Sequence, residues 1–595
     1  MTLAQMIRNR HRQWKDRTCL RVKDVGGYRD LSWDEFYTAA LDLAGALVGR
    51  GIQPQDRVAI LSHSCAEWAM ADTAILSAGA VCVPLYPSLT RADLAPLLQR
   101  SGARGLFVAD AEQLARCLPL LDEVESLEFV VVFDAAAETY SDPRVIGLTA
   151  FRSVGTEHHE AVEERLEGAH ADDLATIIFT SGTTGEPKGV RLSHANILSN
   201  VEAALRRFDI GPGDVCLAHL PLAHIFERMA GYYLMLSAGA VIAYAEDIQS
   251  VARNLTEVHP TVAISVPRIF EKVYGGIQTN AAAATGPTRA LAFWALGVAR
   301  HVGDLTAAGT ALPLGLRLQH WVADRLVYAK IRARMGGRLR YFLSGGAPLA
   351  PELAKFFTAV GIPVFEGYGL TETSPVIAAN FPGHNRVGSV GPLLDNIDVR
   401  IAEDGEILVK GPSVFTGYFN DEAATAEAFS GDGYFMTGDI GALDADGFLR
   451  ITDRKKDLIV TAGGKNVAPQ KVENLLKLSK YIAEAMLYGD RRKFISALIV
   501  PDFEWLGRYA ELKGLPMGDA AALVAHPTVQ DFYQRLVADL QHKAGLPSHE
   551  SVKRLVLLDH EFSAGDGEVT PTLKLRRRNV TEHYRPQLEA LYETE

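Results

Sequence analysis

Short β-rich runs alternate with helical stretches in the first half of the chain, and this alternation constrains the fold most strongly. Leu127–Phe133 is a near-continuous apolar run, as expected of a strand that is buried on both faces. The sequence predicts further strands at Arg57–Ser62, Val81–Tyr86, Gly105–Ala109, Leu174–Thr180, Ala240–Ala245, Thr261–Val266 and Leu339–Leu343, and helices at Cys65–Ala78 and Arg91–Arg100. This βαβα order predicts an α/β fold with a largely parallel sheet covered by helices.

The stretch from Gly286 to Met335 interrupts this order, because it has helical periodicity and little strand signal. Leucine, valine and tryptophan side chains recur on one face of each of two predicted helices: Leu291, Trp294, Val298 and Val302, then Leu314, Leu318, Trp321 and Val322. Two interpretations stay open for these faces. They either pack against the core or form a patch that faces a membrane or admits a lipid.

The pattern changes again between Val387 and Thr452, where short alternating strands are joined by Asp-Gly turns. This pattern predicts a small β-rich subdomain at about 387–453. The charged stretch Asp453–Asp457 then predicts a linker. The residues after it mix helix and strand and predict a separate α+β domain.

Composition excludes several classes of protein. The 60 Lys and Arg residues against 72 Asp and Glu give a net charge of −12, which argues against a partner that is nucleic acid. No run reaches the roughly 18 apolar residues that span a bilayer, and the start of the chain has no apolar signal segment. The five cysteines are odd in number and form no C-x-x-C motif, so we expect reduced thiols in a cytoplasmic protein.

The segment Ile177–Gly189 carries the strongest functional signal. It reads IIFTSGTTGEPKG, an apolar strand followed by a loop of glycines and hydroxyl side chains and then Lys188. Glycines let backbone N–H groups approach a ligand, hydroxyls add donors, and the lysine adds positive charge, so the loop suits a polyphosphate. It is not a Walker A loop, because Pro187 stands where that motif needs its second glycine.

The loop resembles the phosphate-binding signature of the AMP-forming adenylating enzymes, and further motifs of that family follow in order. They are SGGAPL at Ser344–Leu349, EGYGLTET at Glu366–Thr373, YFMTGD at Tyr434–Asp439, DRKKDLI at Asp453–Ile459 and GGKNVAP at Gly463–Pro469. The resemblance covers about Leu31 to Tyr584. It implies an N-terminal adenylation domain of doubly wound sheets over residues 1–453 and a mobile α+β C-terminal domain over 454–595.

The resemblance also implies a reaction in two halves. A carboxylate attacks the α-phosphorus of ATP to give acyl-AMP and pyrophosphate, and the thiol of coenzyme A then displaces AMP. The matching positions assign ATP or AMP contacts to Thr180, Ser181, Gly182, Thr183, Thr184, Gly185, Gly345, Gly346, Ala347, Glu366, Gly367, Tyr368, Asp439 and Arg454. Among them, Tyr368 and Gly345–Ala347 would wall the adenine slot, and Asp439 would accept the ribose hydroxyls.

The same resemblance assigns catalytic roles to Lys188, Thr371, Glu372 and Lys574. Thr371 would bond the α-phosphate and Glu372 would hold Mg²⁺, which prefers oxygen ligands. Lys574 would bridge the carboxylate and the α-phosphate. Here the sequence departs from the commonest pattern, because Leu573 stands where a glycine usually precedes this lysine.

The C-terminal motifs imply a domain that swings between the two half-reactions. Lys456 falls at the hinge position of the family, and Gly463 and Gly464 would lie against the pantetheine arm of coenzyme A. A second interpretation of Lys574–Arg578, KLRRR, is a solvated basic face.

The acid substrate is indicated by Pro221–Arg228, PLAHIFER, and by Leu326–Leu349, which resemble the long-chain fatty-acid–CoA ligases. His224 would lie near the mouth of the substrate pocket, with a capping or core role as its alternative. Some bacterial relatives have a Trp gate four residues after this histidine, but Arg228 stands there.

We therefore expect a long-chain fatty-acid–CoA ligase with fatty acid, ATP and coenzyme A as substrates and peripheral membrane contact as an open question. One alternative is a fatty acyl-AMP ligase that hands its acyl group to a carrier protein. It would carry an inserted segment, and no extra block stands between Ser389 and Asp453. A non-catalytic lipid- or nucleotide-binding scaffold is disfavoured, because Lys188, Thr371, Glu372, Asp439 and Lys574 are all present.

Overall fold

The structure is a computed structural model that describes residues 1–134, 142–180, 186–516, 518–563, 565–570 and 575–593. Its first sheet has the strand order β7-β6-β5-β3-β4-β8-β9, in which only β9 is antiparallel to its neighbour. The strands are β3 Arg57–Leu61, β4 Val81–Leu85, β5 Ala103–Val108, β6 Phe129–Val132, β7 Val145–Gly147, β8 Leu174–Thr180 and β9 Lys188–Ser193. The predicted parallel sheet is thus confirmed in this part.

A second sheet has the order β15-β14-β13-β12-β10-β11-β1-β2 and is parallel except at its two edges. Its strands are β1 Thr18–Asp24, β2 Gly27–Ser32, β10 Val215–Ala218, β11 Val241–Tyr244, β12 Val262–Ser265, β13 Tyr341–Ser344, β14 Val364–Gly369 and β15 Val376–Ala379. Each of the eight strands predicted by residue range from the sequence overlaps a strand of one of these two sheets. The chain therefore has the predicted α/β fold, with two sheets in the first part.

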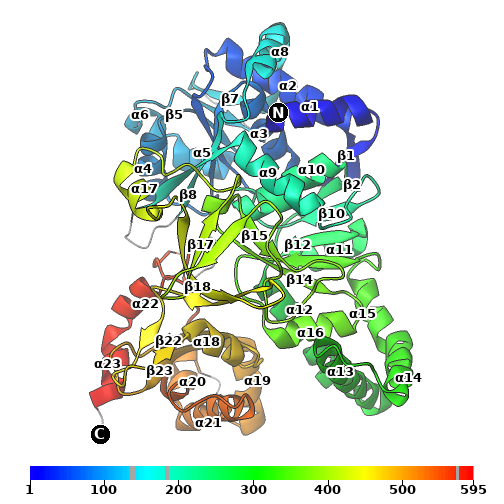
Figure 1. Cartoon of the computed structure of the whole chain (residues 1–595), viewed down its shortest axis with the longest axis vertical. Coiled ribbons are helices and arrows are strands. Elements are labelled where there is room, and N and C mark those ends of the chain that lie inside the picture. The colour runs from blue at the N-terminus through cyan, green and yellow to red at the C-terminus, as the bar shows by residue number, and fades with distance from the viewer. Residues whose placement is uncertain (135–141, 181–185, 517, 564, 571–574, 594–595) are drawn as a thin grey trace.

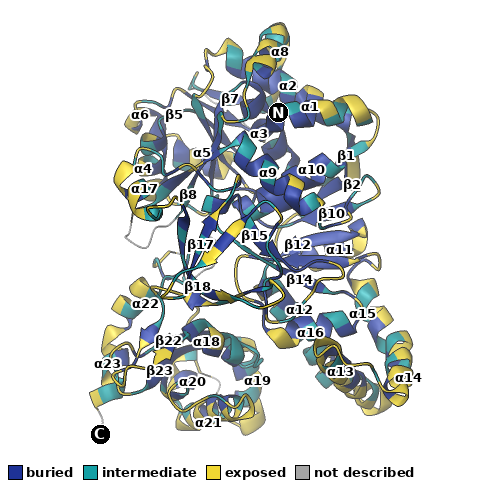
Figure 2. Ribbon diagram, viewed as in Figure 1, coloured by how far each residue is buried: buried dark blue, intermediate teal, exposed yellow. Residues whose placement is uncertain are grey.

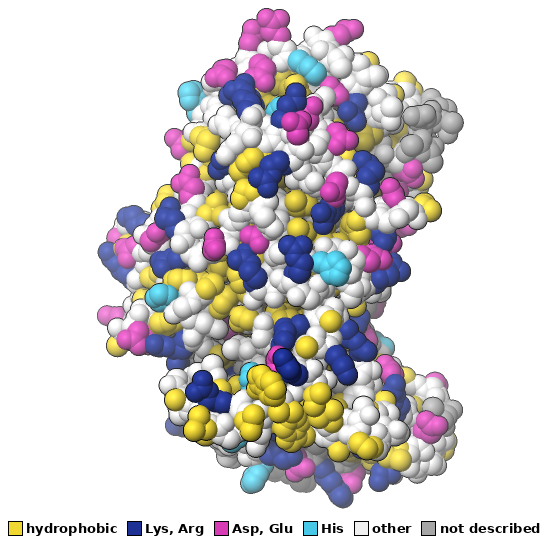
Figure 3. All heavy atoms as spheres, turned by 90° about the vertical axis from the view of Figure 1, so that its right-hand side faces the viewer, with side chains coloured by type: hydrophobic (Ala, Val, Ile, Leu, Met, Phe, Trp, Pro, Cys, Tyr) yellow, Lys and Arg dark blue, Asp and Glu magenta, His cyan; other side chains and the backbone are white. Residues whose placement is uncertain are grey.

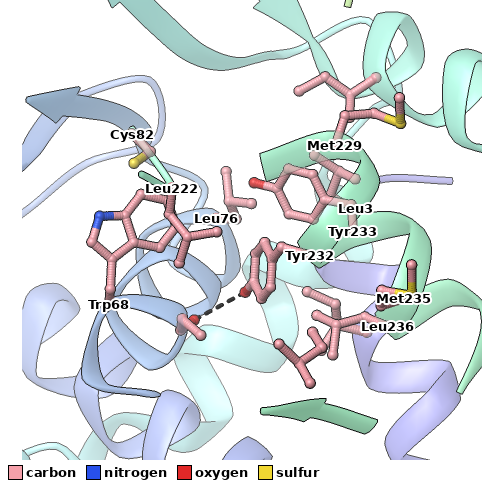
Figure 4. Packing of buried hydrophobic residues seen from close by; sticks show 14 of the residues in the cluster. Leu3, Trp68, Leu76, Cys82, Leu222, Met229, Tyr232, Tyr233, Met235 and Leu236 are labelled. Atoms are coloured by element: carbon pink, nitrogen blue, oxygen red, sulfur yellow. Dashed lines mark hydrogen bonds between the residues drawn. The ribbon is translucent and has the colours of Figure 1, made fainter. Parts of the chain in front are cut away.

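Helices from the first part cover both sheets, which Figure 2 shows as largely buried. They are α1 Leu3–Trp14, α2 Trp33–Gly49, α3 Ala66–Ser77, α4 Arg91–Ser101, α5 Ala111–Cys117, α6 Leu120–Glu123, α7 Leu148–Ser153, α8 His159–Gly168, α9 His194–Leu205, the π-helix η3 Glu227–Tyr233, α10 Leu234–Ala238, α11 Val251–Val258, α12 Pro267–Ala283 and α16 Pro351–Ala359. Trp68 of α3 packs with Tyr232 and Tyr233 of η3 in the largest core cluster (Figure 4). This cluster joins the two halves of the first part.

The predicted helical stretch after Gly286 forms α13 Gly286–Ala307, α14 Leu314–Ala323, the π-helix η4 Asp324–Tyr328 and α15 Ala329–Arg334. Val298 and Val302 of α13 are buried against the core, which confirms core packing for that part of the face. Core packing is wrong for Trp294, Leu314, Leu318 and Trp321, whose side chains are exposed. These helices lie at the lower right of Figure 1.

The predicted β-rich subdomain is an antiparallel sheet in the order β16-β17-β18-β19. Its strands are β16 Asp398–Ile401, β17 Glu406–Lys410, β18 Phe435–Leu443 and β19 Leu449–Arg454, with α17 Glu422–Ala428 between them. The predicted linker begins inside β19, because Asp453 pairs with Ile440 and Arg454 with Asp439. Strand pairing therefore holds the first two residues of that charged stretch.

The last part of the chain is the predicted mixture of helix and strand, at the lower left of Figure 1. It contains the hairpin β20 Ile459–Val460 and β21 Asn466–Val467, and a sheet of β22 Ile482–Tyr488, β23 Ile495–Pro501 and β24 Val552–Leu557. Its helices are α18 Pro469–Lys477, α19 Phe503–Lys513, α20 Ala520–Ala525, α21 Pro527–Lys543, α22 Arg577–His583 and α23 Arg585–Glu593. It has a core cluster of its own, as a separate domain requires.

Two further expectations concern the whole chain. All five cysteines are described and are free thiols, four of them buried. Among the described helices, none has the length and apolar character to cross a membrane.

Candidate active site

The predicted nucleotide motifs meet at the carboxyl ends of β13 and β14. These strands are parallel neighbours with Ser344 paired to Glu366, so Gly345–Ala347 follow the end of β13 beside Glu366–Tyr368 in the last part of β14. Gly346 has a φ of 83°, a conformation that glycine adopts without strain. In open α/β sheets, ligands bind outside the carboxyl ends of the strands, and these motifs lie there.

Glu366 supports the loop that follows β13. Its carboxylate is buried and accepts a hydrogen bond from the backbone N–H of Leu349 at 3.0 Å. Burial raises the pKa of Glu366 to about 7. The described contacts thus give Glu366 a role in holding the loop after SGGAPL.

Tyr368 and Asp439 connect this sheet to the small antiparallel sheet. The Tyr368 hydroxyl donates to Asp439 Oδ2 at 2.7 Å, and Arg454 Nε lies 3.4 Å from Asp439 Oδ1. Asp439 is buried, while Arg454 is half exposed and stands opposite it on β19. A carboxylate accepts several donors at once, so Asp439 can exchange these partners for the paired hydroxyls of a ribose.

Lys188 and Glu372 come together through Tyr418. The Lys188 ammonium lies 5.0 Å from the centre of the Tyr418 ring, and the Tyr418 hydroxyl donates to Glu372 Oε1 at 3.0 Å. Burial raises the pKa of Glu372, and Tyr418 counters that shift by bonding the charged form. Thr180 pairs with Lys188 across the β8–β9 hairpin, and Thr371 opens the short helix Thr371–Thr373 that carries Glu372.

Sequence reasoning missed Tyr418. It lies far from Lys188 and Glu372 along the chain and outside the motifs that carried the resemblance. Three backbone contacts position it. Val190 and Tyr418 form an isolated β-bridge. Phe419 N donates to Gly189 O at 2.7 Å, and Phe415 N donates to Glu372 O at 2.8 Å. The sequence alone does not mark this tyrosine, because only the folded structure shows that its segment lies beside the β8–β9 hairpin.

Six predicted site residues lie outside the described residues. They are Ser181, Gly182, Thr183, Thr184 and Gly185 of the loop and Lys574. Their roles stay predictions.

An apolar cavity adjoins the nucleotide strands. Its walls are mostly apolar side chains, including Ala204 of α9, Phe208 just after that helix and Phe226 beside η3. Ser344 and Gly367, which also belong to the strand ends of β13 and β14, complete the lining. A side chain on Gly345 would come within 2.9 Å of the Phe226 ring, so Gly345 allows this ring to sit between cavity and strand end. The cavity is small, about 30 Å³, so an alkyl chain enters only if the lining moves.

His224 and Arg228 flank this wall in different ways. His224 Nδ1 accepts a hydrogen bond from the backbone N–H of Phe226 at 3.1 Å. Phe226 lines the cavity, whereas His224, two positions earlier in the chain, does not. Arg228 is fully buried and paired with Asp72 of α3, and it donates to Thr176 of β8 at 2.7 Å. Arg228 therefore links α3, η3 and β8 in the core, and it stands where some relatives have a Trp gate.

The C-terminal motifs are at the surface in this arrangement. Gly463 and Gly464 form the exposed tip of the β20–β21 hairpin, and Lys456 is exposed after β19. Between the domains, Arg268 of α12 lies 3.9 Å from Glu484 of β22 and 3.9 Å from Glu561. Lys477 of α18 pairs with Glu484 at 3.1 Å, close to Glu271 of α12.

The chain belongs to the AMP-binding enzymes: the family model matches residues 7–419, and the model of the C-terminal domain of AMP-binding enzymes matches residues 456–595. The resemblance read from the motifs is thereby confirmed.

The chain is also similar to curated relatives. The long-chain-fatty-acid–CoA ligase FadD15 of Mycobacterium bovis is 37% identical over 100% of this chain and 97% of its own length. Long-chain-fatty-acid–CoA ligase 1 of Homo sapiens is 31% identical over 95% of this chain and 83% of its own length.

Solved structures show the same fold. The adenylation domain of a carboxylate reductase from Mycobacterium chelonae superposes with a TM-score of 0.77 at 23% identity, covering 100% of this chain and 91% of that one. The anthranilate CoA ligase AuaEII, solved with anthranoyl-AMP, gives a TM-score of 0.75 at 18% identity, covering 99% and 98%. The fold is that of the adenylation enzymes.

Proposed function

We propose that the protein is a long-chain fatty-acid–CoA ligase. It activates a fatty acid with ATP to acyl-AMP and pyrophosphate, and it then transfers the acyl group to coenzyme A. The observation that carries this proposal is the apolar cavity that shares Ser344 and Gly367 with the strand ends of the nucleotide motifs. An alkyl chain held there has its carboxylate at the strand ends, beside the α-phosphate position. Relatives named long-chain-fatty-acid–CoA ligases support the same substrate class.

The reaction needs positioning and charge stabilisation rather than a protein nucleophile. Lys188 and Thr371 would contact the phosphates of ATP, neutralise their charge and orient them. Asp439 would exchange Tyr368 and Arg454 for the ribose hydroxyls, and Tyr368 with Gly345–Ala347 would wall the adenine.

Mg²⁺ fits this site through Glu372. One carboxylate oxygen, Oε1, takes the Tyr418 hydroxyl, and no described cluster of three or more His, Cys, Asp or Glu side chains offers a complete set of metal ligands. Mg²⁺ keeps several waters and binds through one or two carboxylates plus substrate phosphates, so a single half-buried Glu suits it. When bound, the ion would neutralise charge on the phosphates.

The C-terminal domain would serve both half-reactions. In this proposal the chain divides into 1–453 and 454–595, turns at Lys456, presents Lys574 for adenylation and presents Gly463 and Gly464 to the pantetheine arm. Gly463 and Gly464 have no side chains, so the backbone there leaves room for that arm. Gly464 also has a φ of 71°, which glycine adopts without strain. We also propose a cytoplasmic location with peripheral membrane contact.

A substrate panel tests the proposal. Purified protein is mixed with ATP, Mg²⁺, coenzyme A and acids from acetate to long-chain fatty acids, plus an aryl acid, and acyl-CoA and acyl-AMP are measured by mass spectrometry. We expect acyl-CoA to rise toward the long-chain acids. Acyl-AMP without any thioester would instead favour the fatty acyl-AMP ligase, and equal turnover of acetate would contradict the long-chain assignment.

A pair of matched substitutions ties the panel to the cavity. Ala204→Leu adds bulk to the cavity wall, whereas Ala299→Leu adds the same bulk to a buried cluster that contains no residue of the cavity wall. Overpacking costs typically about 1–3 kcal/mol at either site, so the two variants are matched in stability. Only Ala204→Leu should shift the preference toward shorter acids; the same shift in both variants would remove the acyl chain from this cavity.

A further inference from the structure

Helix α14 has an apolar face that points away from the protein. Leu314, Leu318 and Trp321 are 81%, 64% and 54% exposed, whereas Leu316 and Ala323 of the same helix are buried. At about 100° per residue, the three exposed side chains fall within an arc of roughly 60°, and the two buried ones lie on the opposite side. The helix therefore needs only its inner face for packing, and the outer face is unused by the fold.

The apolar surface extends to the neighbouring elements. Phe293 and Trp294 of α13 and Leu326 of η4 are also exposed large hydrophobic side chains. The helices that carry them are fixed to one another, because α13 packs against α14 and the buried Tyr328 hydroxyl donates to Ala295 O at 2.6 Å. We call these six residues of α13, α14 and η4 the hairpin face. Figure 3 shows hydrophobic side chains gathered on the lower part of the molecule, with Lys and Arg side chains around them.

Basic side chains accompany the hairpin face. Arg289 lies over the Phe293 ring at 5.8 Å, and Arg325 lies over the Trp321 ring at 4.9 Å. Arg300 of α13 and Arg317 of α14 are exposed as well. The two acidic residues of the helices are neutralised, since Asp304 pairs with Lys355 and Asp324 with Arg332. A protein with a net charge of −12 thus concentrates unopposed positive charge at one apolar surface.

We propose that the hairpin face docks on the surface of a bilayer that contains anionic lipids. Leucine and tryptophan side chains would enter the boundary between headgroups and acyl chains, which is where amphipathic tryptophan is favoured. The arginines would contact lipid phosphates while their aliphatic stems stay against the apolar surface. The helices would lie on the membrane, because none of the described helices can cross one. This inference locates the peripheral membrane contact named in the proposed function, and it does not depend on the catalytic assignment.

Charge argues against a second copy of the chain as the occupant. A twofold contact brings the same patch of both copies together, so the arginines of one copy would face the arginines of the other. No acidic side chain of the hairpin is left to oppose them, because Asp304 and Asp324 are already paired. An anionic bilayer has a negatively charged surface and an apolar interior, so it complements both the arginines and the apolar side chains of the hairpin face.

The test is sedimentation of the full-length protein with vesicles. Phosphatidylcholine vesicles are compared with vesicles that also contain phosphatidylglycerol, without substrates. We expect strong binding to the anionic vesicles, weaker binding to the neutral ones, and a loss with increasing salt, because salt screens the arginine contacts. Equal binding to both compositions, or none to either, would overturn the proposal.

Matched variants locate the contact. Leu318→Asp should reduce the partition coefficient about tenfold or more, because it puts a charge into the apolar face. Leu512→Asp is the control, since Leu512 is 82% exposed on α19 of the C-terminal domain and should leave binding unchanged. Both variants should melt at the wild-type temperature, because neither side chain is buried. Equal losses from the two variants would contradict docking through the hairpin face.

Two further readings separate the sources of binding. Arg317→Gln combined with Arg325→Gln should weaken binding to anionic vesicles and flatten its salt dependence, with little effect on neutral ones. Light scattering without lipid should give the same mass for wild type and Leu318→Asp. A larger mass for the wild type alone would show that the face joins copies of the chain and would overturn the membrane assignment. Acyl-CoA formation without vesicles should be unaffected by Leu318→Asp, so failure of the docking proposal is distinguishable from failure of the proposed function.

Discussion

The polar contacts of the nucleotide site are shorter than the ion pairs that join α12 to the C-terminal domain. Tyr368 donates to buried Asp439 at 2.7 Å, and Tyr418 donates to Glu372 at 3.0 Å. At the domain contact, half-exposed Arg268 lies 3.9 Å from each of its two acidic partners. Exposed pairs at such distances contribute little, about 0–1 kcal/mol. The comparison indicates that close hydrogen bonds hold the site, whereas the Arg268 contact of α12 adds little to stability.

Removing the charge of Asp439 should have the largest effect. Asp439→Asn loses a charged acceptor for the ribose, and hydrogen bonds to charged groups contribute about 1.5–3 kcal/mol each. We expect kcat/KM for ATP in pyrophosphate exchange to fall roughly a hundredfold or more. The control is Asp432→Asn, which alters an exposed turn of the same subdomain. Equal activity of the two variants would remove Asp439 from the site.

The buried carboxyl of Glu366 should make stability depend on pH. Its folded pKa of about 7 exceeds the ordinary 4.5, so the folded state holds a proton that the unfolded state releases between these values. Stability from this group is therefore present at low pH and is lost as pH rises toward 7. Glu366→Gln cannot ionise at this position. From pH 5 to pH 8 its free energy of unfolding should therefore rise, relative to that of the wild type, by at most roughly 3 kcal/mol. Urea unfolding at both pH values measures this, and a constant difference would show that Glu366 does not titrate in this range.

Tyr418 tests whether the polar contacts at the phosphate site matter for turnover. Tyr418→Phe keeps the ring under Lys188 and removes the bond to Glu372, so we expect about a tenfold fall in adenylation, with a higher Mg²⁺ requirement. Tyr434→Phe removes a hydroxyl bonded to Asp398 elsewhere in the subdomain and is the control. An unchanged Mg²⁺ titration in Tyr418→Phe would mean that Tyr418 only packs.

The domain contact should show the smallest effect on stability and a selective effect on rate. Arg268→Ala should change the free energy of unfolding by less than about 1 kcal/mol, because its side chain is half exposed. If this domain arrangement serves one half-reaction, the ratio of the two half-reaction rates should change severalfold. Arg253→Ala removes an exposed pair on α11 and should leave that ratio alone. Equal ratios in both variants would mean that the contact is not released between the two steps.

Sequence predicted the parts of the site that local motifs encode. Eight strands of the two large sheets followed from apolar runs, and Tyr368, Asp439 and Arg454 were predicted as site residues before the structure paired them. Tyr418 could not be predicted, because its role depends on two partners that only the fold brings to it. The exposure of Leu314, Leu318 and Trp321 was equally open, because α14 has apolar side chains on both sides and periodicity does not say which side packs.

The most direct test of the two-step account is Lys574→Ala assayed in each half-reaction separately. Starting from free fatty acid, ATP and Mg²⁺, acyl-AMP formation should be abolished. Starting from supplied acyl-adenylate and coenzyme A, thioester formation should be largely retained, because the other face of the C-terminal domain would serve that step. Equal loss of both half-reactions would contradict the account.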